Sequence, residues 1–516
     1  MQYKFVLCSL IAGLSVSCSN QAPQQEPAAV EETTKTEAIY HSPFDAEATK
    51  QLDEFIESAR QLLGVPGIAV GVVDHGEVVY KQGFGTTGID NGIPITTQTL
   101  FSLCDISKAV SGYALAKVAQ DGDLRWDEPL SQMLNNFEAS TPELTQRLTV
   151  ADALCDCSGL PGNPLASFFT FGSDNYTKAL ARIKTMPFVK NIGKHPISGR
   201  NNALFSLGCY ATALRIYPDL PPQDAFRNLV QKRVLTPLGM TSTTYRPDLR
   251  NTAMPHGSDI HGNVRLIDCP KDQDFATLEP AFGLWSNVDD MLKLIQAEID
   301  SQEPQNLERR KERAQRDGLH SAGIAMRMQI RRDVVMYGFR DAQNGYENSL
   351  IFIPDRKLGA IVLANARLSR LYLDLIVAKI LDIAMNQSAA PWLLEEMTRR
   401  LQAANDSTEP LIGKTWIIEP DHAWYKQFLG TYHDDVLGWI EITDEGNAIY
   451  INVGEWRSRL GVRIDNTGNK SMLLLDPPLA GFSLTPTFEN KRLKAIELIE
   501  PHRIYRFVKQ TRPKKP

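Results

Sequence analysis

The stretch FSLCDISKAVSGYALAKVA, residues Phe101–Ala119, decides the fold of this chain. It predicts a short buried strand, a tight turn at Asp105 and then an amphipathic helix, because apolar residues recur at helical spacing from Ile106 onward. The Asp-Gly-Asp sequence at 121–123 should end the helix. Lys108 follows Asp105 by one helical turn, so the sequence places an acid and a base together at the start of this helix.

Composition and charge narrow the class of protein. The chain has 516 residues, of which 43% are hydrophobic and 22% are charged, as in ordinary globular proteins. This length predicts two or more domains. The net charge of −6 indicates no basic face, so we expect no nucleic-acid partner. After residue 20, no stretch approaches the roughly 18 consecutive apolar residues that a membrane span requires.

The N-terminus carries a targeting signal. Lys4 precedes the apolar run Phe5–Val16, which is typical of a bacterial secretory signal. The residues before Cys18 also resemble a lipoprotein signal, so we expect residues 1–18 to be the signal and Cys18 to carry a lipid that anchors the protein to a membrane. A simple signal peptide that is cleaved nearby is the alternative. Residues 19–44, rich in Gln, Pro, Glu and Thr, predict a disordered tether.

The cysteines predict no metal centre. Two of the seven lie in the signal, and an odd number remains in an exported protein, so at least one is free or pairs between molecules. Cys155 and Cys157 have the spacing of half a zinc site, but no second Cys/His pair accompanies them. We interpret them as buried free thiols and expect neither a metal nor a cofactor.

Several segments occur in the order that is known from one enzyme family. They are Val65–Val70, the Leu160-Pro161 pair, Pro237–Met240 (PLGM), Phe282–Met291 (FGLWSNVDDM) and Gly345–Asn365 (GYENSLIFIPDRKLGAIVLAN). Over residues 45–390 the chain resembles the class C β-lactamase and D-alanyl-D-alanine carboxypeptidase family of penicillin-recognising serine hydrolases. The resemblance implies an antiparallel sheet flanked by helices, an all-helical lobe beside it, and an active site between the two.

The residue pattern independently favours the same α+β class. Strand signals cluster at 66–82 and 334–365, and helical patterns lie between them, so N- and C-terminal strands should meet in one sheet.

The family's catalytic motifs are altered in this chain. The resemblance places the nucleophilic serine at Asp105, with its lysine retained as Lys108. The tyrosine-x-asparagine motif falls at Gly199-Arg200-Asn201, where only Asn201 remains. The lysine/histidine-x-glycine motif falls at Phe339-Arg340-Asp341, and a further family element becomes Cys155-Asp156-Cys157-Ser158. The family-equivalent site residues are therefore Asp105, Lys108 and Asn201, and their activity is doubtful.

The exchange of serine for Asp105 argues against acyl transfer. A carboxylate that attacks an amide or ester would form a reactive anhydride, whereas carboxylate nucleophiles suit glycosyl and phosphoryl transfer. Asp105 is also a favourable helix N-cap, worth about 1 kcal/mol, and can pair with Lys108. We interpret both residues as a capped helix with an internal ion pair. The alternative nucleophiles are Ser107, Cys104 and Ser158, none of which has a lysine one turn downstream.

After residue 390 the composition changes. Residues 391–420 predict a helix and a linker. Residues 421–510 contain eight short strand patterns separated by turn residues, which indicate a small up-and-down β-barrel. The opening Leu429–Tyr432 resembles the start of the lipocalin-like domain that many members of the hydrolase family carry. A β-sandwich accessory domain is the alternative.

We therefore expect an exported, lipid-anchored envelope protein that has lost its catalytic machinery and has a binding or regulatory role. Lys108, Arg200 and Arg340 would leave positive charge in the cleft, which suits a carboxylate-bearing ligand such as a peptidoglycan fragment or a peptide. A protein partner in the cell envelope is a second expectation. The competing class is an active esterase, amidase, D-Ala peptidase or β-lactamase with a displaced nucleophile. A third alternative is a purely structural envelope protein whose cleft is filled by its own side chains. No ligand would raise the stability of such a protein.

Overall fold

The computed structural model describes most of the chain after residue 39. The described residues are 40–90, 92–162, 166–169, 176–188, 201–267, 278–331, 334–367, 371–387, 411–453, 456–500 and 503–511, with a few helical positions between 392 and 402. The predicted signal with Cys18, most of the tether, and Arg200 lie outside them. Residues 42–516 form one compact unit. Within the described ranges, no helix combines the length and the apolar character needed to cross a membrane.

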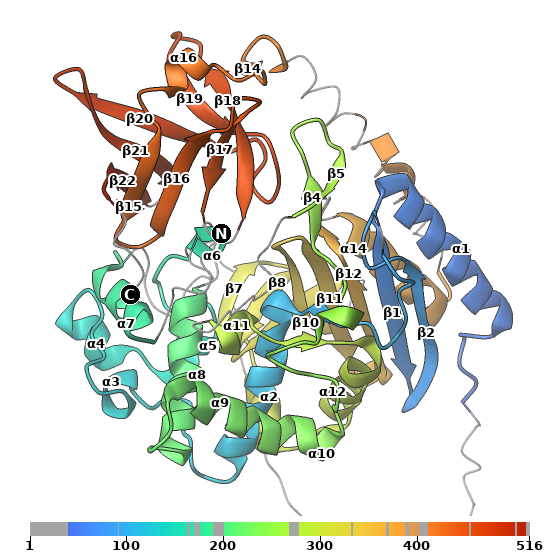
Figure 1. Cartoon of the computed structure of the whole chain (residues 1–516). Helices are drawn as coiled ribbons and strands as arrows, with labels where there is room; N and C mark the ends of the chain where they lie inside the picture. The colour runs from blue at the N-terminus through green and yellow to red at the C-terminus, as the bar shows by residue number, and fades with distance from the viewer. Residues whose placement is uncertain are drawn as a thin grey trace, which may run out of the picture. The chain divides into compact units, whose positions relative to one another are not determined.

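One antiparallel sheet forms the centre of the N-terminal two thirds of the chain (Figure 1). Its strand order is β2-β1-β12-β11-β10-β9-β8-β7. The strands are β1 (Gly67–Asp74), β2 (Glu77–Gly85), β7 (Ala314–Asp317), β8 (His320–Gly323), β9 (Met326–Arg331), β10 (Val334–Gln343), β11 (Tyr346–Ile353) and β12 (Leu358–Ala364). The N-terminal hairpin therefore pairs with the C-terminal strands, and the α+β fold predicted from the sequence is confirmed.

Helices cover both faces of this sheet. Helices α1 (Ala46–Leu63) and α14 (Leu371–Ala384) pack on one face, and α12 (Val288–Asp300) packs with the helical lobe on the other (Figure 1). Strand β1 is buried along its whole length, which explains its unbroken apolar sequence. Gly71 allows α12 to approach, because a Cβ there would lie 2.5 Å from a methyl group of Val288.

The helical lobe lies between β3 and β7 in sequence. Its helices are α2 (Ser107–Gln120), α3 (Leu130–Met133), α4 (Pro142–Arg147), α5 (Val150–Leu154), α6 (Ala166–Phe169), α7 (Tyr176–Thr185), α8 (Asn202–Ile216), α9 (Pro222–Val230), α10 (Thr236–Leu238), α11 (Glu279–Phe282) and α13 (Pro304–Arg309). Short strands β3 (Phe101–Ser102) and β6 (Trp285–Ser286) pair, as do β4 (His256–Ser258), β5 (Val264–Leu266) and β13 (Ala366–Arg367). Helix α2 is buried all round except at Lys117 and Gln120, so the prediction of an amphipathic helix was wrong.

The C-terminal region is a closed barrel. Eight strands follow one another around it, namely β15 (Gly430–Asp434), β16 (Gly438–Asp444), β17 (Ile449–Asn452), β18 (Arg457–Ile464), β19 (Lys470–Leu474), β20 (Ser483–Glu489), β21 (Arg492–Glu500) and β22 (Arg503–Lys509). Strand β15 pairs with β22 and closes the barrel, while β14 (Trp416–Ile417) adds to β18 and α16 (His422–Tyr425) precedes β15. The predicted eight-stranded up-and-down barrel is confirmed.

Two aromatic residues of the helical lobe belong to the core of the barrel. Phe168 and Phe169 are almost fully buried there, and the ring of Phe169 lies 5.7 Å from that of Trp456. The Trp456 indole N–H donates to the Phe168 carbonyl at 2.5 Å. The segment at α6 is thus held by side chains that are almost 300 residues later in the chain.

A buried carboxyl group lies between the sheet and α14. Glu347 of β11 is 1% exposed, and its Oε1 lies 3.5 Å from the Arg340 guanidinium, which also pairs with Asp374 of α14. Burial raises the pKa of Glu347 to about 8, from an ordinary value of 4.5, although the Arg340 charge opposes this shift.

We predict that Glu347 makes the stability of the protein depend on pH. Between about pH 4.5 and 8 the folded state binds one proton more than the unfolded chain, so the free energy of unfolding falls as pH rises through this window. The total loss of unfolding free energy should be on the order of 5 kcal/mol. In urea unfolding at both ends of the window, Glu347→Gln should remove this slope, whereas Glu77→Gln, on the exposed part of β2, should retain it. An unchanged slope in Glu347→Gln would contradict this assignment.

Candidate functional site

The first turn of the buried helix places Asp105 and Lys108 in the interior. A 3-10 turn, Cys104–Ile106, leads directly into α2. Asp105 lies inside that turn, and neither the turn nor α2 has a side-chain cap, so the predicted N-cap role of Asp105 was wrong. Cys104 takes the left-handed backbone conformation at φ +51°, and Asp105, which follows it, is fully buried.

Lys108 is a buried ammonium group between two carboxylates. Its Nζ lies 3.5 Å from Oδ2 of Asp105 and 3.4 Å from Oδ2 of Asp156, while the ring centre of Phe205 lies 5.0 Å away. Lys108 is 1% exposed and Asp105 is fully buried. The predicted ion pair is therefore present, but it is a buried pair in which each charge depends on the other for its solvation.

A third carboxylate binds the backbone at the start of the helix. The Asp105 N–H donates to Oδ2 of Asp341 on β10 at 3.1 Å. Asp341 stands where the resemblance places the glycine of the third motif. A free backbone N–H at a helix start can stabilise an oxyanion, but here a carboxylate of the protein itself accepts the hydrogen bond of Asp105.

Arg340 does not contribute charge to this site. Successive residues of a strand point to opposite faces of the sheet, so Asp341 faces α2 while Arg340 faces α14. Arg340 pairs there with Glu347 and Asp374. The expectation that Arg340 lines the cleft was wrong for this reason, and Arg200 lies outside the described residues.

The second motif contributes the residue after the predicted one. Asn201 caps α8, because its Oδ1 accepts the Leu204 N–H at 3.0 Å, and its Nδ2 donates to the Pro161 carbonyl. Asn202 donates instead to Oδ1 of Asp105 at 3.2 Å. The family motif located this segment correctly. The side chain that reaches Asp105, however, belongs to Asn202, one position after the predicted Asn201.

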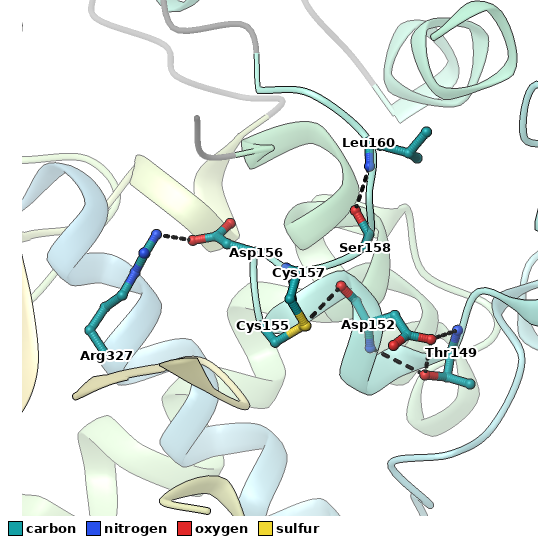
Figure 2. The surroundings of a disulfide bond; sticks show 8 residues. All are labelled: Thr149, Asp152, Cys155, Asp156, Cys157, Ser158, Leu160 and Arg327. Carbon is teal, nitrogen blue, oxygen red and sulfur yellow. Dashed lines mark hydrogen bonds and ion pairs between the residues drawn. A yellow bond between two sulfur atoms is a disulfide. The ribbon is translucent and has the colours of Figure 1, made fainter. Parts of the chain in front are cut away.

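A disulfide loop supplies the second carboxylate of Lys108. Cys155 and Cys157 are bonded to each other, with Cα atoms 5.1 Å apart, so the prediction that they are free thiols was wrong. The residue between them, Asp156, has φ +54° and points toward Arg327 of β9, whose guanidinium lies 2.6 Å from Oδ2 (Figure 2). We call Asp105, Lys108, Asp156, Arg327 and Asp341 the charge cluster; it contains three carboxylates and two cations.

The alternative nucleophiles direct their reactive atoms to other groups. Ser107 Oγ accepts the Leu284 N–H at 3.2 Å, and Ser158 Oγ accepts the Leu160 N–H at 3.3 Å and points away from Asp156 (Figure 2). The Cys104 thiol donates a hydrogen bond to the Gln343 carbonyl, with Sγ 3.6 Å from the oxygen. Burial raises the pKa of the Cys209 thiol behind the cluster well above its ordinary value, which keeps that thiol neutral.

The described side chains do not form a metal centre, since no three His, Cys, Asp or Glu residues among them are arranged to hold an ion. The disulfide also removes the two thiolates that had the spacing of zinc ligands. A separate cavity of about 720 Å³ lies among α3, α7 and α8, lined by residues that include Met133, Tyr176 and Leu180. It contains no member of the charge cluster.

Comparison with known proteins identifies the family of the larger region. The family model described as Beta-lactamase matches residues 52–380. Protein flp of Staphylococcus aureus (strain N315) is 21% identical over 242 residues, which cover 46% of this chain and 45% of that protein. The mouse mitochondrial serine beta-lactamase-like protein LACTB is 30% identical over 159 residues, covering 27% of this chain and 29% of that protein. The chain thus spans less than half the length of these curated relatives.

Solved structures share the fold at low sequence identity. The octameric penicillin-binding protein homologue from Pyrococcus abyssi has a TM-score of 0.57 at 18% identity and covers 89% of this chain and 99% of its own. A class C beta lactamase from Rhodobacter sphaeroides has a TM-score of 0.53 at 18% identity, covering 64% of this chain and 98% of its own. The first likeness extends over most of the chain, and the second is limited to about two thirds of it.

We predict that the buried ammonium of Lys108 stabilises the fold. Lys108→Met should lower the free energy of unfolding by about 3–5 kcal/mol, because Asp105 and Asp156 lose a buried partner. Lys117→Met is a matched control on the same helix, since Lys117 also pairs with a carboxylate, Glu303, and also lies 5.0 Å from an aromatic ring centre. Its pair is partly exposed, so its loss should cost less than about 1 kcal/mol. Equal effects in chemical denaturation would contradict the assignment.

Proposed function

The chain belongs to the beta-lactamase family, and from this premise we propose that it is a member that forms no acyl-enzyme and serves as a binding or regulatory protein. The observation that carries the proposal is the position of Asp105. Its side chain is ion-paired with Lys108 and its backbone N–H is bonded to Asp341. Both the nucleophile position and the neighbouring donor are thus engaged by the protein's own charges.

The chemistry of a carboxylate at this position supports the proposal. Attack by Asp105 on an ester or amide would give an anhydride, which is too reactive to form a useful intermediate. The lysine of a serine hydrolase would take a proton from the nucleophile, but the ammonium of Lys108 is held between two carboxylates, Asp105 and Asp156. Among the described residues, Lys108 Nζ thus contacts two carboxylates of the protein and no nucleophilic hydroxyl group.

The hydrogen bond from Asp105 to Asp341 supports the proposal independently. Acyl transfer develops negative charge on an oxygen atom, which backbone N–H groups near the nucleophile must stabilise. The carboxylate of Asp341 already accepts the Asp105 N–H, and its negative charge would repel an oxyanion placed there. Loss of one such donor typically costs on the order of 100-fold in rate.

The proposed setting of this binding role is the cell envelope. The apolar run Phe5–Val16 and the residues before Cys18 support export and a lipid anchor. A ligand with a carboxylate group, such as a peptidoglycan fragment or a peptide, suits the cations Lys108 and Arg327, and a protein partner in the envelope is the other proposed target. Radiolabelled palmitate should be incorporated into the full chain but not into Cys18→Ala; incorporation into both would contradict the anchor.

Intact-mass measurement after incubation with a fluorophosphonate and with benzylpenicillin tests the catalytic part of the proposal. We expect no covalent adduct on the full-length protein. Asp105→Ser should react on the order of 100-fold more slowly than Asp105→Ser/Asp341→Gly, because only the double variant has both the nucleophile and a free backbone N–H. A covalent adduct on the unaltered protein would show an active hydrolase with a displaced nucleophile, and peptide mapping would identify it.

The single variant Asp105→Ser is the matched control for the double variant. It has the serine hydroxyl, but the backbone N–H of residue 105 is still bonded to Asp341. Thermal unfolding of each variant establishes that it is folded. If the double variant remains unlabelled although it is folded, Asp105 and Asp341 are not the groups that prevent acylation, and the physical argument given for the proposal is wrong.

A further inference from the structure

We propose that Asp156 is an internal carboxylate ligand of Lys108 and Arg327, and that these two cations form a binding site for the carboxylate group of a small molecule or peptide when Asp156 withdraws. The inference rests on the proposed function, because it assigns a ligand class to the same non-acylating site. In the absence of ligand, Asp156 on the Cys155–Cys157 loop occupies this site.

Two cations from separate parts of the fold converge on one carboxylate. Lys108 approaches from α2 at 3.5 and 3.4 Å from the two carboxylate oxygens, and Arg327 approaches from β9 at 2.6 Å from Oδ2. The Asp156 side chain is 4% exposed, so its charge is withdrawn from water and stabilised by these partners. A carboxylate held by an ammonium and a guanidinium is the arrangement by which proteins bind carboxylate ligands.

The Arg327 side chain connects this position to solvent. It is 32% exposed, whereas Lys108 is 1% exposed, so the two cations form a short path from the surface to the interior. A ligand carboxylate can therefore meet Arg327 first and Lys108 second. Once a ligand carboxylate is bound, its pairing with the buried cation is screened less by water than its pairing with the exposed one.

The disulfide loop that carries Asp156 keeps its carboxylate close to the two cations. Asp156 takes the left-handed conformation at φ +54° between two cysteines that are bonded to each other (Figure 2). The short disulfide ring restricts the positions of its carboxylate, so binding to Lys108 and Arg327 costs little translational freedom. Because the ring holds the Asp156 carboxylate close to both cations, its local concentration there is high, and a free ligand must compete with it. Opening of the disulfide ring lowers this local concentration.

The neighbouring charges favour a carboxylate over a phosphate. Asp105 lies 3.5 Å from Lys108, and Asp341 binds the backbone N–H of Asp105 just before the same helix. These two negative groups repel a dianion about twice as strongly as they repel a monoanion. Withdrawal of Asp156 removes one negative charge from the cluster, and a monocarboxylate replaces that charge.

Rescue of a truncated variant by acetate tests the site. Glycine accepts φ +54° without strain, so Asp156→Gly removes the carboxylate and its methylene group while retaining the backbone. We expect the apparent Tm to fall by about 5 °C. Millimolar sodium acetate at constant ionic strength should then raise it by about 2 °C in a saturable manner, because acetate binds only the folded state. Acetamide, a neutral molecule of similar shape, should have no such effect.

Two controls separate this result from a general effect of salt. The unaltered protein, in which Asp156 occupies the site, should not respond to acetate. Asp465→Gly removes an exposed carboxylate in the barrel that is bonded by Thr467 and Asn469, and it should not respond either. Equal acetate responses in all three proteins, or none in a folded Asp156→Gly, would overturn the proposal.

A second variant tests the role of the disulfide and keeps Asp156. Cys155→Ser/Cys157→Ser opens the ring, so the double variant should gain an acetate response that the unaltered protein lacks. If it behaves as the unaltered protein does, the ring does not hold Asp156 in place and that part of the proposal is wrong. These titrations report binding, whereas acyl labelling reports catalysis, so failure of one proposal can be distinguished from failure of the other.

Discussion

The ammonium group of Lys108 is the charge on which the arrangement of the site depends. It lies in the interior with Asp105 and Asp156 within 3.5 Å of it, and Arg327 holds the outer side of Asp156. An isolated ion in such a position would be very unfavourable, so each member of the charge cluster is retained in place by the others. Lys108 is thus the buried counter-ion of both Asp105 and Asp156.

This constraint brings together elements that are distant in the sequence. Helix α2 supplies Lys108, the disulfide loop supplies Asp156, β9 supplies Arg327, and β10 supplies Asp341. The central sheet makes this possible because β9 and β10 are neighbours: Asp341 on β10 binds the turn before α2, and Arg327 on β9 binds Asp156. The site therefore joins the sheet to the helical lobe through ion pairs and hydrogen bonds between protein groups.

The barrel is tied to the same lobe by a different interaction. Phe168 and Phe169 follow the Ser158–Pro161 segment and are buried among barrel residues, with the Phe168 carbonyl bonded to Trp456. Burial of aromatic rings contributes more than the single hydrogen bond, which mainly fixes the orientation of the segment. Residues 155–157 and 168–169 are thus held by different groups, the first by the charge cluster and the second by the barrel core.

The amino-acid sequence was enough to predict the α+β class, the family resemblance, the eight barrel strands and the pairing of Asp105 with Lys108. These features follow from local periodicity, from turn residues and from motifs read along one segment, so they need no knowledge of distant contacts. The folded structure was needed to establish that Asp341 and not Arg340 faces α2, because alternation along a strand assigns side chains to faces only after the register is known. It also decided that Cys155 and Cys157 are bonded, that Arg327 completes the cluster, and that Asn202 and not Asn201 reaches Asp105. Each of these depends on the direction of one side chain in space, which neither spacing nor residue type specifies.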